Sequence, residues 1–305
     1  MTLTIVGLGL IGGSAALDLR KAGFAGSLLG VEADAAHAAT ARTRNLVDKV
    51  VSLDAAIPQS DFILLTVPVD AIVGMLPVVL DHIHPSATVA DMGSTKSATV
   101  EAVRGHARRG RYVALHPMAG TENSGPEAAM EGLFRDHTAI ICDAADSAPD
   151  AVKTTEHLLR ALGMRLTHMP AAQHDLHAAC LSHMPHVVAY ALALTALEAE
   201  RDNGLILKLA GGGFASIVRT AKSAPEMWVP IIMQNRAAIL EALGNFMSQI
   251  QTFAQTVKAG DGKRLAQLIS TANSIRAVLA AGQTTPTQAA LPSEPQPDQP
   301  GLPSV

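Results

Sequence analysis

The chain has 305 residues, a formal net charge of −4 and 48% hydrophobic residues. That length suggests about two domains, and the acidic balance excludes the basic surface that nucleic-acid binding needs. Two cysteines, Cys142 and Cys180, cannot form a disulfide framework and are expected to be thiols in a reducing cytoplasm. We expect no apolar run of the roughly 18 residues that span a bilayer, and neither a signal peptide nor a membrane partner.

The first predicted element is a short apolar strand, residues 3–7, which leads into a Gly-x-Gly-x-x-Gly sequence and then into residues that favour a helix. In a dinucleotide-binding turn, the first glycine permits a tight turn, the second lets the backbone approach a pyrophosphate, and the third lets the helix pack closely on the strand. The exposed N–H groups at the start of such a helix attract phosphates. The expected cofactor-binding residues of the turn are Gly7, Gly9, Leu10, Ile11 and Gly12.

A second predicted strand, residues 27–31, is followed by Glu32, which lies 20 residues beyond Gly12. A carboxylate at this point binds ribose hydroxyls and would repel the additional phosphate of NADP, so NAD is the predicted cofactor. Arg42 and Arg44 lie too far along the next helix to reverse this prediction. The alternative is a glycine-rich turn in another α/β fold.

Short apolar runs alternate with helical patterns as far as about residue 168. The predicted strands are residues 3–7, 27–31, 62–67, 87–91, 112–115, 138–142 and 165–168. The predicted helices are residues 12–22, 34–44, 70–81, 96–108 and 150–162. This alternation predicts an α/β fold with a mostly parallel, doubly wound sheet of the Rossmann type, in which ligands bind at the carboxyl ends of the strands.

Two residues with useful chemistry follow predicted strands. Ser94 comes after strand 87–91, where its hydroxyl could face a nicotinamide or simply cap the next helix. His116 follows strand 112–115, and a neutral imidazole there could take the proton of a substrate hydroxyl while hydride leaves the same carbon. A purely structural histidine is the alternative. Glu122 could bind a cation, orient a histidine or be solvated.

From about residue 170 the pattern becomes helical. Residues 171–201 predict one long helix with a kink at Pro185, residues 226–258 a second that tolerates Pro230 in its first turn, and residues 262–280 a third. We therefore predict a dinucleotide-binding domain, a mainly α-helical substrate and dimerisation domain that forms a homodimer, and a disordered tail rich in Pro and Gln. The expected boundaries are residues 1–168, 169–281 and 282–305.

Four histidines fall within 13 residues: His174, His177, His183 and His186. At about 100° per residue along a helix, the first pair and the second pair point to roughly opposite sides. One ion could not bind all four, so no metal site is predicted. The functional interpretation is that one pair faces an interdomain cleft, and the alternative is a set of core or interface histidines.

Together these segments resemble the prephenate/arogenate dehydrogenases of tyrosine biosynthesis. The resemblance runs from residue 1 to about 280 and rests on Gly7-x-Gly9-Leu10-Ile11-Gly12-Gly13-Ser14, Asp91-x-Gly93-Ser94-x-Lys96, His116-Pro117-x-Ala119-Gly120-x-Glu122-x-Ser124-Gly125, His174-Asp175, Ser182-His183-x-Pro185-His186, Gly211-Gly212-Gly213-Phe214, Arg219, Pro225-Glu226-Met227-Trp228 and Asn235-Arg236. The blocks around His116 and His183 are far more specific than the glycine pattern.

The resemblance implies oxidative decarboxylation of prephenate to 4-hydroxyphenylpyruvate, with hydride transfer to NAD. It implies that His116 accepts the proton of the 4-hydroxyl group and that Ser94 hydrogen-bonds with both. It also implies that Arg219 binds a substrate carboxylate and that Glu122 pairs with His183 to close the pocket. The residues implied to line or gate the substrate pocket are Thr121, Glu122, His183, His186 and Trp228.

Two departures from the family pattern concern the substrate side. Many members carry Arg-Asp after the Gly-Gly-Gly-Phe block, where this chain has Ala215-Ser216, and Asp before the Pro-x-x-Trp block, where it has Ala224. Both leave the hydride chemistry intact, but they leave arogenate open as a second substrate. The remaining alternatives are a hydroxyacid dehydrogenase with a similar pair of domains and a nucleotide-binding protein without turnover. Retention of Ser94 with His116 and Arg219 favours the dehydrogenase.

Overall fold

The computed structural model describes residues 1–282 and divides the chain into two compact units, Met1–Gly244 and Asn245–Val305. The strands and the helices as far as Gly244 belong to one unit, so the expected domain boundary between residues 168 and 169 stays a prediction. The expected disordered tail, residues 282–305, lies outside the described residues apart from Gly282.

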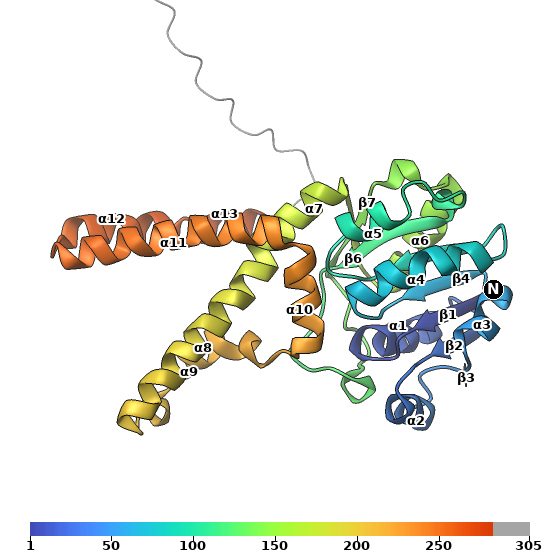
Figure 1. Cartoon of the computed structure of the whole chain (residues 1–305), viewed down its shortest axis with the longest axis horizontal. Coiled ribbons are helices and arrows are strands. Elements are labelled where there is room, and N and C mark those ends of the chain that lie inside the picture. Colours follow the sequence, from blue (N-terminus) through green and yellow to red (C-terminus); the bar gives the residue numbers. More distant parts are fainter. Residues whose placement is uncertain (283–305) are drawn as a thin grey trace, which may run out of the picture. The chain divides into compact units, whose positions relative to one another are not determined.

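One sheet of eight strands forms the centre of the first unit (Figure 1). The strands are β1 (Thr2–Val6), β2 (Ser27–Val31), β3 (Lys49–Val50), β4 (Phe62–Leu65), β5 (Thr88–Asp91), β6 (Tyr112–Pro117), β7 (Thr138–Cys142) and β8 (Arg165–Met169). Their order is β3-β2-β1-β4-β5-β6-β7-β8, and all neighbours are parallel except β6 and β7. The predicted doubly wound α/β fold is therefore confirmed. The sequence did not predict β3, because two residues are too few to show a periodic pattern.

Helices cover both faces of this sheet. They are α1 (Leu10–Lys21), α2 (Ala35–Thr43), α3 (Leu53–Ala56), α4 (Val69–His82), α5 (Ser97–Ala102) and α6 (Pro149–Ala161). Successive strand residues point to opposite faces: Phe62 and Leu64 pack in one core with α1 and α6, while Ile63 and Leu65 pack in another with α4. Both faces are thus filled by apolar side chains, which leaves the carboxyl ends of the strands for ligands.

The helix predicted over residues 96–108 is much shorter in the structure, where α5 ends at Ala102. The side chain of Arg108 donates hydrogen bonds to the carbonyls of Leu80 and Ile83 at the end of α4. These tertiary contacts draw the following segment toward α4, and helix propensity does not outweigh them.

The helical part of the chain differs from its prediction at two breaks. Its helices are α7 (Ala171–Ala178), α8 (Met184–Asn203), α9 (Gly212–Val218), α10 (Pro225–Gln234), α11 (Arg236–Lys258), α12 (Gly262–Asn273) and α13 (Ile275–Gly282). The predicted helix 226–258 is broken at Asn235, and the predicted helix 262–280 is broken at Ser274. A π turn, Ala179–His183, joins α7 to α8 just before Pro185, which cannot donate a helical hydrogen bond.

Within the described residues one helical run, Ala171–Arg201, is long and apolar enough by length and composition to cross a membrane. The expectation that the chain holds no such run is therefore wrong. Its mean hydropathy reaches 1.4 although histidines, a proline and an aspartate interrupt the apolar residues. The same run carries buried His174, Asp175 and His183, which are polar groups that a lipid-facing helix rarely holds.

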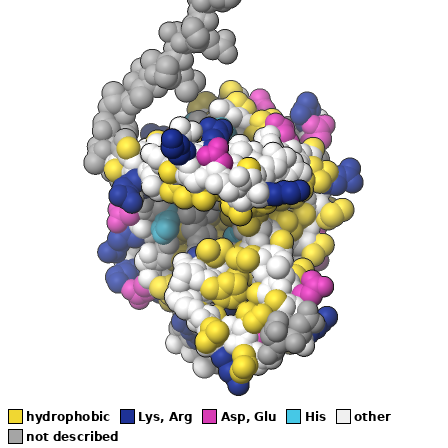
Figure 2. Space-filling model, turned by 90° about the vertical axis from the view of Figure 1, so that its left-hand side faces the viewer, with side chains coloured by type: hydrophobic (Ala, Val, Ile, Leu, Met, Phe, Trp, Pro, Cys, Tyr) yellow, Lys and Arg dark blue, Asp and Glu magenta, His cyan; other side chains and the backbone are white. Residues whose placement is uncertain are grey.

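Large apolar side chains are exposed on the helices of the first unit. Leu181 in the π turn is 78% exposed, and Leu194 on α8 is 68% exposed. Ile217 on α9 and Leu240 on α11 are also exposed. Figure 2 shows hydrophobic side chains on the face that is turned to the viewer. Monomeric proteins rarely expose so many large apolar groups close together, so these helices have the character of an interaction surface.

Candidate active site

The turn between β1 and α1 has the geometry that a bound dinucleotide requires. Gly7 has a φ of +92°, where a side chain would be strained. A Cβ atom on Gly12 would lie 2.0 Å from the carbonyl oxygen of Gly7, so only glycine fits there. A Cβ on Gly9 would meet nothing closer than the Gly125 main chain at 4.0 Å. The space beside Gly9 is thus open to a pyrophosphate, and the residues present fit such a group.

The carboxylate of Glu32 lies beside the same turn. One of its oxygens accepts a hydrogen bond from the Leu8 N–H at 2.8 Å, and the other accepts one from the Asp34 N–H at 3.1 Å. The side chain comes from the end of β2, which pairs with β1. The ribose-binding role of Glu32 stays a prediction, and its position beside the turn is compatible with that role.

A buried ion pair joins β5 to β6. Lys96 and Asp91 have fully buried side chains that contact each other, and the Lys96 ammonium also donates to the Leu115 carbonyl at 2.8 Å. Asp91 accepts further hydrogen bonds from the Tyr112 hydroxyl at 2.6 Å and the Gly93 N–H at 2.9 Å. Burial, together with the Asp91 charge, raises the pKa of Tyr112 well above its usual value. The network fixes the chain directly before His116.

His116 lies on β6 and contacts a second histidine. Its Nδ1 is 2.7 Å from Nε2 of His174 on α7, and the Nδ1 of His174 is 2.8 Å from a carboxylate oxygen of Asp175. Both rings are buried. Burial, with the nearby His174, Lys96 and His183, lowers the pKa of His116 well below 6.5. A neutral imidazole at pH 7 is the form that can accept a proton.

Three of the predicted substrate residues form an aromatic cluster. The rings of His186 and Trp228 are stacked with centroids 3.6 Å apart, and His183 meets the Trp228 ring edge-on at 6.0 Å. Burial lowers the pKa of His183 to about 4, so this ring is also neutral at pH 7. The Nδ1 of His183 lies 3.1 Å from the amide of Asn235 at the break between α10 and α11. The buried indole N–H of Trp228 has no hydrogen-bond partner in the described structure and could donate to a ligand.

Two predicted pairings differ in the structure. Glu122 contacts Arg219 at 2.7 Å instead of His183, because His183 is held by Asn235 on a buried face while Arg219 is half-exposed. The nitrogen that contacts His116 belongs to His174, and no hydrogen bond from Ser94 to His116 is found among the described residues. Ser94 is half-buried just after β5. Thr121 lies next to Glu122, and its hydroxyl accepts the Asn123 N–H.

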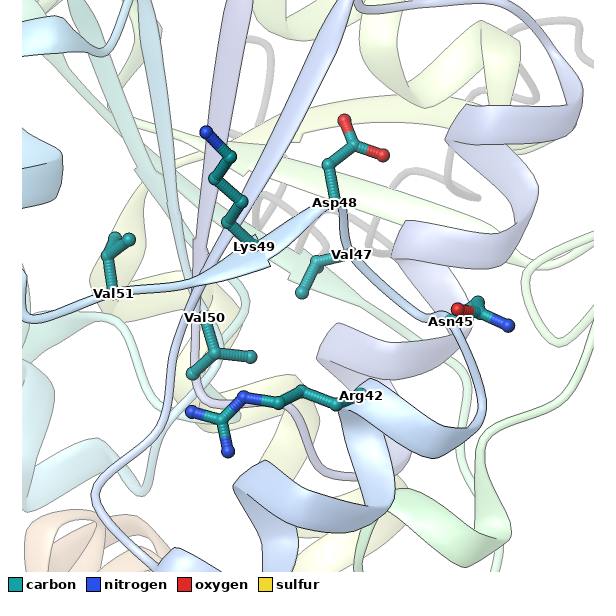
Figure 3. Close-up of a pocket in the computed structure, with 7 residues that line it drawn as sticks. All are labelled: Arg42, Asn45, Val47, Asp48, Lys49, Val50 and Val51. Carbon is teal, nitrogen blue, oxygen red and sulfur yellow. The ribbon is translucent and has the colours of Figure 1, made fainter.

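A hollow of about 380 Å³ lies beside β3 and α2, and Figure 3 shows the side chains around it. It is lined by Arg42, Asn45, Val47, Asp48, Lys49, Val50 and Val51. None of these is a candidate site residue, and the hollow has no convergent catalytic groups. Residues 1–282 also contain no group of three His, Cys, Asp or Glu side chains placed to hold a metal ion.

Four further residues of the sequence motifs have contacts that were not expected of them. Lys96 fixes β6 through Asp91 and Leu115, and Asn235 links His183 to the carbonyl of Asp175. His174 and Asp175 extend the hydrogen bonds of His116. A buried charge or amide at a helix end needs a hydrogen-bond partner, so the sequence carried a signal for these residues. The partners of His174 and Asn235, however, lie more than 50 residues away along the chain.

A histidine kept neutral beside other buried histidines, in a sheet whose first turn fits a dinucleotide, is typical of a nicotinamide-dependent dehydrogenase of the Rossmann class. The family comparisons specify the class further. The nucleotide-binding domain of prephenate dehydrogenase matches residues 15–168, and the dimerization domain of prephenate dehydrogenase matches residues 170–271. The chain belongs to the prephenate dehydrogenase family.

Individual relatives agree with this assignment. A prephenate dehydrogenase of Bacillus subtilis is 30% identical over 278 residues, which are 90% of this chain and 75% of the relative. A cyclohexadienyl dehydrogenase of Zymomonas mobilis is 29% identical over 86% of this chain and 90% of its own. Prephenate dehydrogenase of Aquifex aeolicus, solved with hydroxyphenyl propionate and NAD+, superposes with a TM-score of 0.84 at 26% identity, over 92% of this chain and 98% of its own. Arogenate dehydrogenase of Synechocystis superposes with a TM-score of 0.74 at 27% identity, over 92% of this chain and all of its own.

Proposed function

We propose that this protein is an NAD-dependent prephenate dehydrogenase that forms 4-hydroxyphenylpyruvate in tyrosine biosynthesis. The observation that carries the proposal is the buried, neutral His116 on β6, hydrogen-bonded to His174. The complex of the Aquifex aeolicus relative with NAD+ supports the choice of cofactor. No residue set in residues 1–282 suggests a metal, and the reaction needs none because aromatisation drives it.

The chain supplies a base and a carboxylate-binding group. His116 takes the proton of the 4-hydroxyl group through its Nε2 as hydride leaves the same ring carbon. Bound NAD supplies the hydride acceptor. The ring carboxylate then leaves as carbon dioxide, the bonding electron pair completes the aromatic ring, and His116 returns its proton to the phenol oxygen. Ser94 is proposed to hydrogen-bond the hydroxyl in the bound state and to hold the reacting atoms in place.

Arogenate is the second candidate substrate. It differs from prephenate only in the side chain, which ends in an amine in place of a keto group. Arogenate is retained as a candidate because the relatives include a cyclohexadienyl dehydrogenase and an arogenate dehydrogenase. In this chain Ala215 and Ala224 stand where many family members carry charged residues. Two of the absent groups are aspartates, replaced by Ser216 and Ala224. Without carboxylates that could pair with the ammonium group of arogenate, prephenate is the proposed preferred substrate.

Absorbance at 340 nm during incubation with NAD and one substrate at a time tests the proposal. We expect NADH from prephenate, with slower or no formation from arogenate and none from a simple 2-hydroxy acid. Turnover of the hydroxy acid alone would assign the protein to a different dehydrogenase class. Tight NAD binding without turnover of any of the three would make it a nucleotide-binding protein.

The rate should depend on pH in a way that the buried site defines. His116 acts as a base only when neutral, and its pKa lies well below 6.5 because the ring is buried beside His174, Lys96 and His183. The folded enzyme therefore loses activity only as the pH falls through that lowered value. We expect kcat/KM for prephenate to stay constant from pH 8 down to 6.5 and to decline only below it. An acidic limb centred at or above pH 6.5 would contradict a buried, neutral base.

Arg219 is proposed to bind a carboxylate of the substrate. In the structure its guanidinium contacts Glu122, which leaves its other donors available. Arg219→Ala should raise KM for prephenate by roughly tenfold or more, the loss expected for a charge-assisted hydrogen bond, with a smaller effect on kcat. Lys222→Ala, three residues further on, is the matched control. An unchanged KM in the Arg219 variant would exclude the contact.

The protein is proposed to be a cytoplasmic homodimer. Exposed leucines and isoleucines on α8, α9 and α11 need cover in water, and the matching family domain is described as a dimerization domain. A second copy of the chain is the simplest partner. Sedimentation or light scattering should give twice the mass of 31.7 kDa for one chain.

A further inference from the structure

His116 is held by a histidine that the proposed reaction has not yet used. The rings of His116 and His174 meet at 72° with their centroids 5.0 Å apart, and the nitrogen atoms that face each other are 2.7 Å apart. His174 is 1% exposed, so water does not compete for its ring. The other nitrogen of His174 contacts Asp175, which is also buried.

The series of hydrogen bonds ends at the carboxylate of Asp175, which in its charged form can only accept hydrogen bonds. Burial opposes the charge of Asp175, but hydrogen bonds from His174 and from the Ser97 and Lys96 N–H groups lower its pKa. His174 must therefore carry a proton on the nitrogen that faces Asp175. In the neutral ring the remaining nitrogen of His174 is an acceptor. His116 then donates with Nδ1, and its Nε2 is left with the free lone pair.

We propose that His174, oriented by Asp175, is a positioning residue that holds His116 in the tautomer able to take a proton. The same bonds stabilise His116 after it gains the proton, because its Nδ1–H still points at an acceptor braced by a carboxylate. This inference rests on the proposed function, in which His116 is the base. It assigns His174 and Asp175 to the reaction, although neither is proposed to touch substrate.

The test uses the full-length protein and three replacements of His174. His174→Leu removes the acceptor and should lower kcat by roughly 10–100-fold, with KM values for NAD and prephenate within about twofold of the original. His174→Gln places an amide oxygen where it can accept from His116, and should recover most of the loss. His174→Asn is too short to reach His116 and should behave like leucine. His177→Leu, an exposed histidine on the same helix, is the matched control and should be unchanged.

A double variant separates positioning from simple packing. In a His116→Asn background the base is already lost, so His174→Leu should lower kcat by no more than about twofold further. The proposal would be overturned if His174→Leu lowered kcat in the His116→Asn background by the same factor as in the original protein. Equal kcat values for His174→Gln and His174→Asn would also overturn it. If His174→Leu does not fold, the Gln and Asn variants decide, because they differ only in reach. By contrast, normal kcat in His116→Asn itself would refute the proposed function rather than this inference.

Discussion

His116→Asn is expected to lower kcat for prephenate by roughly 10²–10⁴, the range for loss of a general base. An asparagine amide can still donate to Nε2 of His174, so the buried contact at 2.7 Å is kept while the proton acceptor is removed. The proposed NAD site is the turn after β1, which the substitution does not alter. Steady-state kinetics should therefore show the loss in kcat with an unchanged KM for NAD.

The control for this variant is His177→Asn, the same change at an exposed histidine of α7. Its kinetics should match those of the original protein. Near-normal kcat in His116→Asn would remove His116 from its role as base. Loss of NAD affinity together with kcat would instead indicate a general disturbance of the sheet.

Lys96→Met should lower the free energy of unfolding by about 3–5 kcal/mol, because it leaves the buried charge of Asp91 without its cation. Methionine fills a similar volume, so the effect is mainly electrostatic. Urea unfolding followed by the fluorescence of Trp228, the single tryptophan, measures the change in the unit that holds both residues. The Tyr112 hydroxyl and the Gly93 N–H still contact Asp91, but they are neutral and cannot replace an ammonium.

Lys21→Met provides the comparison. Lys21 pairs with Glu131 at 2.5 Å, but both side chains are more than half exposed, and an exposed ion pair contributes at most about 1 kcal/mol. Adding Asp91→Asn to Lys96→Met should restore part of the lost stability, because no unpaired charge then remains. Equal losses in the Lys96 and Lys21 variants would mean that the buried pair is not held as the structure shows.

Local patterns in the sequence were sufficient to predict the strands of the sheet and the glycine turn after the first strand. Apolar runs and their spacing placed seven of the strands within a few residues, because buried parallel strands must be apolar on both faces. The positions of Gly7 and Gly12 in the turn, and of Glu32 beside it, were also predictable from local sequence. A tight turn admits only glycine, and a carboxylate just after the second strand lies beside that turn whatever the remaining fold does.

The partners of the site residues could not be derived in this way. The bonds from His116 to His174 and from Asn235 to His183 join positions 58 and 52 residues apart, and no periodic pattern records such a distance. The break at Asn235 is also a tertiary effect. The side-chain amide of Asn235 donates a hydrogen bond to the carbonyl of Asp175 and does not lie on a solvated face of a continuous helix. The pairing of Glu122 depends on which face of the helices is buried, and this led to the wrong expectation for His183.

The sequence by itself thus determined the fold class, the cofactor and the family, since these depend on contacts within one strand–turn–helix segment or on motifs of a few residues. Only the tertiary structure decided which group holds His116, which cation pairs with Asp91 and which acid pairs with Arg219. The physical reason is that a buried polar group must be satisfied by whatever the folded chain brings within about 3 Å. That requirement acts through space and not along the chain.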